Sequence, residues 1–143
     1  MQVRDVMTRD IQDVPPSASI REAAEKMRSL DVGALPVCEN NKLVGMITDR
    51  DIAIRAVAAG KDPNSTRVRD AMSGQAYYCL ETEDVAKAVE LMEQQQIRRL
   101  PIFDQQQRLC GIVSLGDIAV RLQDQRLSGE MLGRVSEPGM AQA

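Results

Sequence analysis

Apolar residues in the segment 19–27, SIREAAEKM, recur every three or four positions. Ile20 and Met27 fall, with the alanines between them, on one face of a helix. Ser19 followed three residues later by Glu22 is a capping-box signature for the start of that helix. The pattern therefore predicts an amphipathic helix with one face directed at a core.

Two strands and a second helix are predicted to follow. GALPV at 33–37 indicates a short strand, ENNK a polar turn, and KLVGMIT at 42–48 has the apolar run of a buried strand. These strands predict a hairpin. Asp51 then opens DIAIRAVAAG, a helix-forming stretch that ends at Gly60.

The same order of elements occurs twice in the chain. VRDVMT at 3–8 returns 65 residues later as VRDAMS at 68–73, and the remaining patterns follow in register with one inserted residue. The second copy predicts a helix at 84–96, strands at 99–103 and 109–114, and a helix from Asp117 to about Arg126. The chain therefore divides into repeat 1 at 3–60, a linker at 61–67, repeat 2 at 68–126 and a C-terminal tail at 127–143.

Neither repeat is expected to fold alone. A pair of strands flanked by helices cannot cover its own sheet, so two such units packed face to face would supply the missing core. The fold class predicted is α+β.

Composition narrows the chemistry. The 143 residues include 18 Lys and Arg against 21 Asp and Glu, a formal charge of −3, and no His. Ser-His-Asp or Cys-His catalysis and His-containing zinc sites therefore cannot be built from this chain alone. Aromatic residues make up only 2%, and together with the acidic balance this argues against nucleic acid as a partner.

The chain also lacks the marks of secretion or membrane insertion. MQVRDVMTRD carries charges where a signal peptide needs an apolar run, and no stretch approaches the ~20 apolar residues of a membrane span. Cys38, Cys79 and Cys110 have no C-x-x-C spacing, which favours buried thiols over a disulfide framework or zinc site. We expect a cytoplasmic protein without a membrane partner.

Each repeat ends its second strand with the pattern G-h-h-[T/S]-x-x-D, where h is apolar. Thr48 and Asp51 carry it in repeat 1, Ser114 and Asp117 in repeat 2. A hydroxyl and a carboxylate three residues apart at a strand-to-helix junction can cap the helix. The carboxylate can instead accept hydrogen bonds from two ribose hydroxyls while the helix start faces a phosphate. Both roles are compatible.

The two repeats differ just before the Leu-Pro pair of the first strand. Repeat 2 has Arg98 and Arg99 where repeat 1 has Gly33 and Ala34. Adjacent residues of a strand point to opposite faces, so we expect at least one arginine to be directed at a cleft or interface. Arginine is the natural bidentate partner of phosphate, although a solvated pair at a strand edge is the alternative.

In this order and twice over, these motifs resemble the cystathionine-β-synthase (CBS) domain pair, or Bateman module. The resemblance covers residues 3 to about 126 and includes the V-R-D-[V/A]-M lead-in, the capped helix, the h-x-h-P strand and the strand-to-helix junction. It implies two β-α-β-β-α repeats related by pseudo-twofold symmetry, with two clefts that each hold an adenosine-containing ligand.

The resemblance also assigns residues to each cleft. The first would use Thr48 and Asp51 for ribose, Arg98 and Arg99 for phosphates, and Met72, Ser73, Tyr77, Ile97, Leu100 and Pro101 around the adenine. The second would use Ser114 and Asp117 for ribose, with Met7, Thr8, Ile11, Val32, Leu35 and Pro36 around the base. Gly33 and Ala34 offer it no basic group, so it stays empty or selects a less charged adenosyl ligand.

The function predicted is a non-catalytic sensor that binds AMP, ADP, ATP, NAD or S-adenosylmethionine and acts through a protein partner or its own assembly as a homodimer. Asp49 and Asp51 could bind Mg²⁺ together with the phosphates, although two carboxylates at a helix start are usually favourable charge placement. No protein metal site or resident cofactor is expected. The alternative is a dimerising interaction module without a nucleotide. An enzyme is not expected, because P-loop, G-x-G-x-x-G and H-E-x-x-H motifs are missing.

Overall fold

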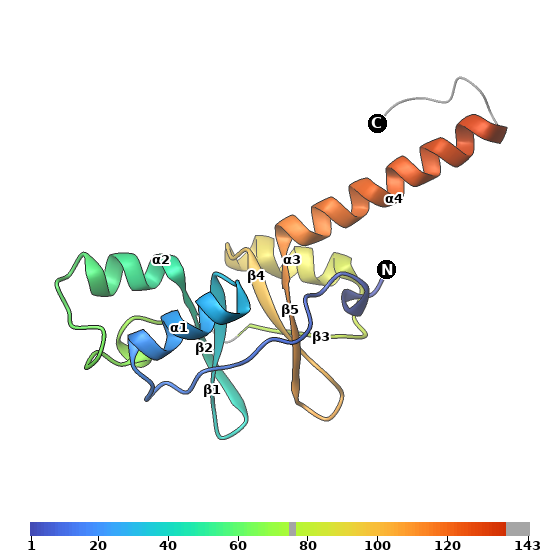
Figure 1. Ribbon diagram of the computed structural model, residues 1–143. Helices are drawn as coiled ribbons and strands as arrows, with labels where there is room; N and C mark the ends of the chain where they lie inside the picture. Colours follow the sequence, from blue (N-terminus) through green and yellow to red (C-terminus); the bar gives the residue numbers. More distant parts are fainter. Residues whose placement is uncertain (75–76, 137–143) are drawn as a thin grey trace.

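The computed structural model describes residues 1–74 and 77–136 of the chain. Two similar halves lie side by side, and the hairpin of each half points its turn in the same direction (Figure 1). The first half contains α1 (Ile20–Leu30), β1 (Ala34–Glu39), β2 (Lys42–Thr48), α2 (Asp49–Asp51) and the π-helical segment η2 (Ile52–Val57). The second contains β3 (Cys79–Leu80), α3 (Val85–Gln95), β4 (Arg99–Phe103), β5 (Leu109–Ser114) and α4 (Leu115–Ser136).

The first helix of each half begins directly after a capping side chain, α1 after Ser19 as predicted and α3 after Asp84, one residue later than predicted. The Ser19 side chain accepts a hydrogen bond from the amide of Glu22 at 3.1 Å, and Asp84 accepts one from the amide of Ala86 at 2.9 Å. This bond satisfies one of the amides that a helix start leaves without an internal partner. The bond from Ala86 is also the main reason why the pKa of Asp84 lies below its ordinary value.

The second helix of each half begins earlier than predicted. The helix α2 begins at Asp49 rather than at Asp51, and Thr48 is its N-cap, because the Thr48 hydroxyl accepts from the amide of Asp51. The helix α4 likewise begins at Leu115 rather than Asp117.

The end of α4 also differs from the prediction. This helix continues to Ser136, so much of the predicted tail is helical. Figure 1 shows α4 extending away from the rest of the molecule, which explains why an apolar periodicity did not reveal it. Pro138, which would break a helix, lies outside the described residues.

The strands form two small sheets. The antiparallel pair β1–β2 aligns Ala34 with Thr48, and β4–β5 aligns Arg99 with Ser114. In the second half β3 adds to β4 in parallel through Cys79 and Ile102. The first half has only a single parallel bridge at the equivalent place, Val14 to Val37, so its expected leading strand is reduced to one residue pair.

Two apolar clusters form the core, one in each half. Ile20, Leu35 and Ile47 are fully buried in the first cluster, and Leu100, Ile102 and Val113 in the second. These residues come from the inner face of the first helix and from the strands, as the apolar patterns predict.

Each cluster also receives residues from the other sequence repeat. Val3, in the short turn η1 (Val3–Asp5), packs in the second cluster, and its amide donates to the carbonyl of Glu83 at 2.8 Å. Val68, in η3 (Val68–Asp70), packs in the first cluster, and its amide donates to the carbonyl of Ala18 at 2.8 Å. The predicted boundaries at 3–60 and 68–126 therefore mark sequence repeats rather than separate packing units.

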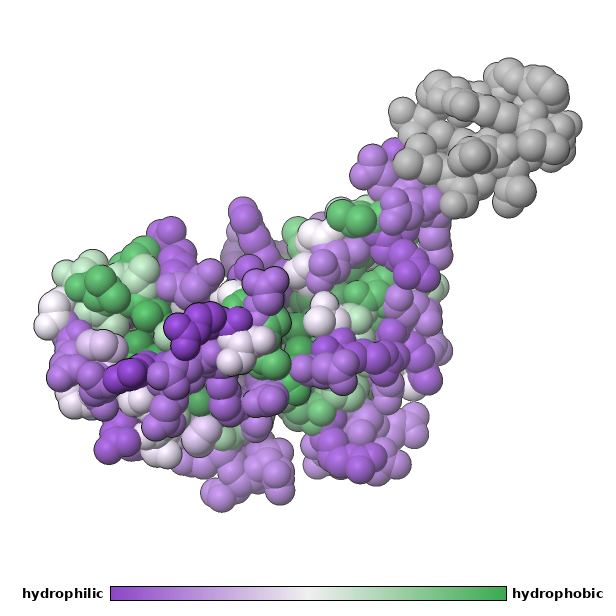
Figure 2. Space-filling view, in the orientation of Figure 1, coloured by the Kyte–Doolittle hydropathy of each residue, from purple (hydrophilic) through white to green (hydrophobic). Residues whose placement is uncertain are grey.

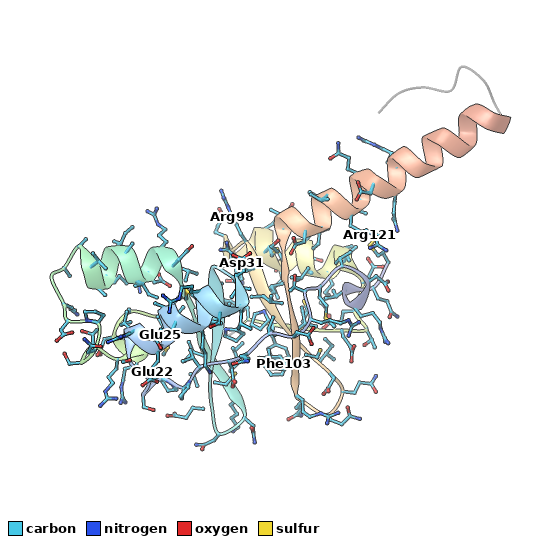
Figure 3. All side chains as sticks on the ribbon, in the orientation of Figure 1. Glu22, Glu25, Asp31, Arg98, Phe103 and Arg121 are labelled. Carbon is cyan, nitrogen blue, oxygen red and sulfur yellow. The ribbon has the colours of Figure 1, made fainter. Side chains whose placement is uncertain are left out.

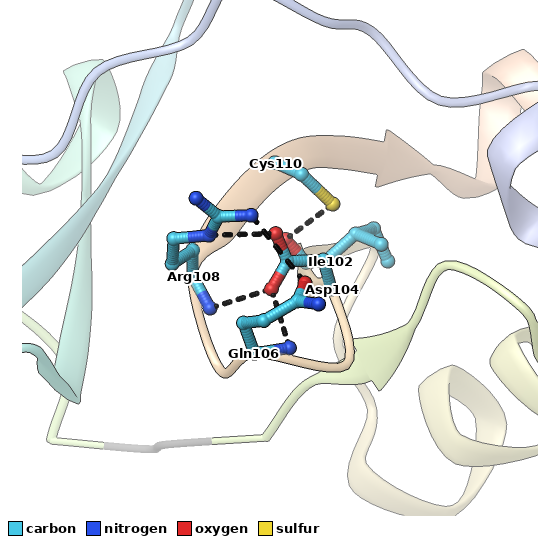
Figure 4. A network of polar contacts seen from close by, with 5 residues as sticks. All are labelled: Ile102, Asp104, Gln106, Arg108 and Cys110. Carbon is cyan, nitrogen blue, oxygen red and sulfur yellow. Dashed lines mark hydrogen bonds and ion pairs between the residues drawn. The ribbon is translucent and has the colours of Figure 1, made fainter.

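The turn between β4 and β5 is held by one carboxylate. Asp104 Oδ1 accepts from the amides of Gln106 and Arg108, both at 2.9 Å, and Oδ2 accepts from Arg108 Nε at 3.1 Å (Figure 4). The hydrogen bond from the backbone amide of Arg108 lowers the pKa of Asp104 more than any of its other contacts does. These hydrogen bonds order the turn between the predicted strands 99–103 and 109–114 and so fix the register of the hairpin.

The three cysteines are free, and two of them are buried. Burial raises the pKa of Cys38 to about 12 and that of Cys79 to about 11, so both thiols stay protonated at neutral pH. Cys110 is half-buried, and its Sγ lies 3.4 Å from the carbonyl oxygen of Ile102 (Figure 4).

Candidate functional site

A pocket of about 620 Å³ lies where β2 ends and α2 begins, facing the start of β4. Its wall combines both repeats: one side is the strand-to-helix junction of the first half, and the other is the segment before β4. The lining residues are Met46, Thr48, Asp49, Arg50, Asp51, Ser73, Tyr77, Gln96, Ile97, Arg98 and Arg99. We call this the larger pocket.

The hydroxyl and carboxylate of the junction form a reciprocal cap. Asp51 Oδ2 accepts from the amide of Thr48 at 2.9 Å, while Thr48 Oγ1 accepts from the amide of Asp51 at 3.1 Å. This pair confirms the capping role. Asp51 is half-buried and lines the pocket, and its Oδ1 has no hydrogen bond within residues 1–74 and 77–136. A carboxylate held in this way can cap the helix and still accept from a ligand.

A backbone bridge brings the second lead-in segment to this junction. The amide of Ser73 donates to the carbonyl of Met46 at 2.9 Å, and the amide of Met46 donates to the carbonyl of Ser73 at 3.1 Å. Gly45 makes this approach possible, because a Cβ at that position would overlap the Ser73 carbonyl oxygen. The bridge sets Ser73 against the wall of the pocket, which Tyr77 also lines.

Two arginines supply positive charge on the other wall. Arg98 and Arg99 are both exposed, and neither side chain has a hydrogen bond or ion pair with any residue that the structure describes. Figure 3 shows Arg98 pointing away from the sheets, between the α2 side and the α4 side of the molecule. Both arginines line the larger pocket, and both remain exposed.

A smaller pocket of about 170 Å³ lies at the pseudo-symmetric position. Ser114 Oγ accepts from the amide of Asp117 at 2.9 Å, which repeats half of the cap seen at Thr48. The lining residues are Thr8, Val32, Gly33, Ala34, Arg99, Ile112, Ser114 and Asp117. Gly33 and Ala34 bring no charge, as expected, but Arg99 reaches this pocket as well and supplies the basic group that the sequence did not place there.

Most of the residues predicted for the first cleft line the larger pocket. They are Thr48, Asp51, Ser73, Tyr77, Ile97, Arg98 and Arg99. Leu100 and Pro101 do not line it and are buried in the sheet, and Met72 packs against the first core cluster. Asp49, which was considered for Mg²⁺, also lines the pocket, and Met46, Arg50 and Gln96 line it without having been predicted. Met46 could have been found, because it lies two residues before Thr48 and therefore on the same face of β2.

Half of the residues predicted for the second cleft line the smaller pocket. Thr8, Val32, Ser114 and Asp117 line the smaller pocket. Met7, Ile11, Leu35 and Pro36 do not line it, and Met7 and Leu35 belong to the two core clusters instead. Ile112, the equivalent of Met46, also lines the smaller pocket and was not predicted. It could have been found in the same way, because it lies two residues before Ser114 on the same face of β5.

A third hollow, of about 460 Å³, lies between the turns of the two hairpins. Leu43, Leu80 and Phe103 form its apolar part, and the ring of Tyr78 meets that of Phe103 edge to face at 5.2 Å. None of the residues predicted for either cleft lines it.

Residues 1–74 and 77–136 contain no group of three or more Asp, Glu or Cys placed to hold a metal ion. Within the same described part, no helix combines the length and apolar character needed to span a membrane.

Comparison with protein families finds one domain twice. The family model described as CBS domain matches residues 3–57 and 68–124. Among curated relatives, the CBS domain-containing protein YhcV of Bacillus subtilis is 44% identical over 134 residues, 94% of each chain. Hypoxic response protein 1 of Mycobacterium tuberculosis is 38% identical over 120 residues, 83% of each chain.

Solved structures show the same architecture. Hypoxic Response Protein I with two coordinated zinc ions superposes with a TM-score of 0.72 at 38% identity, covering 83% of this chain and 97% of that one. CBSX2 in complex with AMP gives 0.69 at 28% identity, covering 85% and 97%. The CBS domain pair of MJ0100, in complex with 5-methylthioadenosine and S-adenosyl-L-methionine, gives 0.70 at 26% identity, covering 87% and 98%.

Proposed function

We propose that this chain, which belongs to the CBS domain family and contains two CBS repeats, is a regulatory module that binds an adenosine-containing ligand in the larger pocket. One observation carries the proposal. A carboxylate, a hydroxyl and a pair of unengaged arginines from different repeats line one pocket of about 620 Å³.

The ribose of the ligand would lie against Asp51. Vicinal ribose hydroxyls are two donors at fixed spacing, and a carboxylate with a free oxygen accepts from such a pair. Half-burial of Asp51 strengthens these bonds relative to a fully solvated carboxylate. The hydroxyl of Thr48 holds the helix start in place beside it.

The phosphates would lie toward Arg98 and Arg99. Guanidinium groups bind phosphate oxygens through two parallel N–H bonds, and here both are free to turn toward a ligand. The apolar side chains of Met46 and Ile97 and the ring of Tyr77 provide surface for a purine. Asp49, which lines the same pocket, would bind Mg²⁺ carried by a nucleotide di- or triphosphate, and Asp51 would keep its free oxygen for the ribose.

Related structures support this ligand class. CBSX2 binds AMP, and the domain pair of MJ0100 binds 5-methylthioadenosine and S-adenosyl-L-methionine. These ligands share adenosine and differ at the 5′ end. The residues that meet the 5′ end would therefore select among them, and in this chain those residues include two arginines, which favour an anionic ligand.

The response to the ligand would pass through a second protein chain rather than through chemistry in the pocket. Ile54 and Val57 of η2 are 49% and 68% exposed, and Val120 of α4 is 60% exposed. Figure 2 shows apolar surface over the α2 side of the molecule and near the start of α4. Such surface favours association, and we propose a homodimer.

A thermal-shift comparison tests the proposal. Full-length protein is heated with millimolar AMP, ADP, ATP, NAD or S-adenosylmethionine, each with and without Mg²⁺. A ligand present at about 100 times its dissociation constant stabilises the folded state by about 2.7 kcal/mol, which raises the melting temperature by several degrees. We expect a selective rise with a phosphate-bearing ligand.

The absence of a shift with all five ligands would contradict nucleotide binding. Sedimentation of the same protein would then decide for or against the remaining function, a dimerising interaction module in which Thr48, Asp51, Ser114 and Asp117 serve only as helix caps.

A further inference from the structure

One side chain, Arg99, lines both pockets. Arg99 is the first residue of β4 and pairs across the hairpin with Ser114, which belongs to the smaller pocket. Its neighbour Arg98 lines the larger pocket alone. Arg99 therefore borders two sites related by the pseudo-symmetry of the repeats.

Arg99 is not committed to either site. Its side chain is exposed and has no hydrogen bond or ion pair with the described residues of the chain. A long, unpaired guanidinium can turn to one side or the other without breaking an existing contact. The choice is therefore left to whatever anion occupies a pocket.

The charge of the smaller pocket depends on that choice. The larger pocket contains Arg50 and Arg98 besides Arg99, against the carboxylates of Asp49 and Asp51. The smaller pocket has only Arg99 against Asp117. When Arg99 turns to the larger pocket, the smaller one keeps an uncompensated carboxylate that repels an anion.

We infer that the two pockets compete for Arg99, so that an anionic ligand in the larger pocket weakens the binding of a second anionic ligand in the smaller one. This inference rests on the proposed function and adds a form of regulation to it. A phosphate takes a guanidinium through two parallel bonds, and one guanidinium cannot offer that pair of bonds to two phosphates. The coupling is reciprocal by linkage.

Calorimetric titration of the full chain with AMP measures the coupling. Asp51→Ala weakens AMP binding in the larger pocket, so that the smaller pocket can be measured with Arg99 uncommitted, and Asp117→Ala identifies the step that belongs to the smaller pocket. We expect AMP to bind the smaller pocket of Asp51→Ala about tenfold more tightly than it binds in the second step of the wild type. A tenfold change in affinity corresponds to about the free energy of one charged hydrogen bond. Adenosine, which has no phosphate, should show no such difference.

Two arginine variants separate the shared side chain from a general effect of charge. In the background of Arg99→Ala the tenfold difference should vanish. Arg98→Ala is the matched control, because it removes the same group from an adjacent exposed position that lines only the larger pocket. It should weaken the first step and keep the difference. If Asp51→Ala does not fold, Asp51→Asn replaces it, since the amide oxygen can still accept from Thr48.

The outcomes distinguish this inference from the proposed function. Equal affinity of the smaller pocket in wild type and Asp51→Ala, or a difference that survives Arg99→Ala, overturns the inference while nucleotide binding in the larger pocket stands. The inference is also overturned if the wild type binds a single AMP molecule and Asp117→Ala does not change that binding. If the wild type binds no AMP, both are wrong.

Discussion

The larger and the smaller pocket use equivalent positions of two repeats, but they measure about 620 Å³ and about 170 Å³. Thr48 corresponds to Ser114 and Asp51 to Asp117, so the strand-to-helix junction is kept. Arg98 corresponds to Gly33, so the positive charge beside the pocket is not kept. The comparison shows that the repeat preserves the frame of a binding site and varies the residues that decide what enters it.

The frame itself is held more firmly in the larger pocket. The cap at Thr48 and Asp51 has two reciprocal hydrogen bonds, whereas at Ser114 and Asp117 only the bond to Ser114 Oγ is made. Asp51 is half-buried and Asp117 is exposed. A more rigid and less solvated carboxylate binds a ligand with a smaller loss of freedom, which favours the larger pocket as the primary site.

The largest effect is expected at the glycines where the lead-in segments cross the strands. Gly45→Ala places a Cβ on the backbone carbonyl of Ser73 and should lower the free energy of unfolding by about 3 kcal/mol, because two backbone segments must separate. At the equivalent Gly111 a Cβ would lie 2.6 Å from the flexible Met7 Sδ and 2.9 Å from Thr8 O, so Gly111→Ala should cost about 1.5 kcal/mol. Urea denaturation measures both.

Gly74→Ala is the control for these substitutions, because nothing lies within 4 Å of its added Cβ. Its unfolding free energy should stay within about 0.5 kcal/mol of the wild type. If Gly45→Ala is no more destabilising than Gly74→Ala, the close crossing beside the larger pocket is not as described.

The next effect distinguishes the two carboxylates in binding. Asp51→Ala should weaken the tightest AMP-binding step by about 1.5–3 kcal/mol, the cost of charged hydrogen bonds to ribose, and Asp117→Ala should leave that step unchanged. Calorimetric titration measures both. Asp51→Asn keeps an acceptor for the Thr48 amide, so its melting temperature without ligand separates loss of the cap from loss of the ligand contact. A tightest step that depends on Asp117 instead would reverse the assignment of the primary site.

The smallest effect concerns the caps in the absence of ligand. Thr48→Val removes the hydroxyl at nearly constant shape and should cost about 1 kcal/mol of stability, because it breaks one bond of a reciprocal pair. Ser114→Ala breaks a single bond at an exposed junction and should cost about 0.5 kcal/mol. Denaturation midpoints with unchanged slopes give both values. Equal losses would show that the two junctions do not differ in rigidity.

Much of the fold could be predicted from the sequence because the signals were local. The bounds of β2, β4 and β5 were predicted correctly from apolar runs between polar turns, and the start of α1 from its capping residue. The local pattern could not predict the exchange of lead-in segments, and only the family resemblance placed Met7 and Thr8 with Ser114, and Met72 and Ser73 with Thr48. VRDVMT and VRDAMS carry the same pattern, so nothing local says which core each one joins.

The site could be predicted in outline for the same reason. Polar residues such as Thr48, Asp51 and Arg98 can be identified in the sequence by their type and spacing, and all three line the larger pocket. The apolar wall was harder. Leu100 is fully buried, whereas Arg99, directly before it, lines a pocket. The two differ because successive side chains of a strand point to opposite faces of the sheet. That Arg99 serves both pockets depends on how the halves pack.

The most direct test of the assignment is a crystal structure of the full chain grown with AMP. The account predicts AMP in the larger pocket, with its ribose hydroxyls donating to Asp51 and its phosphate within hydrogen-bonding distance of Arg98 or Arg99. An AMP molecule bound between the hairpin turns, or anywhere else while the larger pocket holds none, would contradict it.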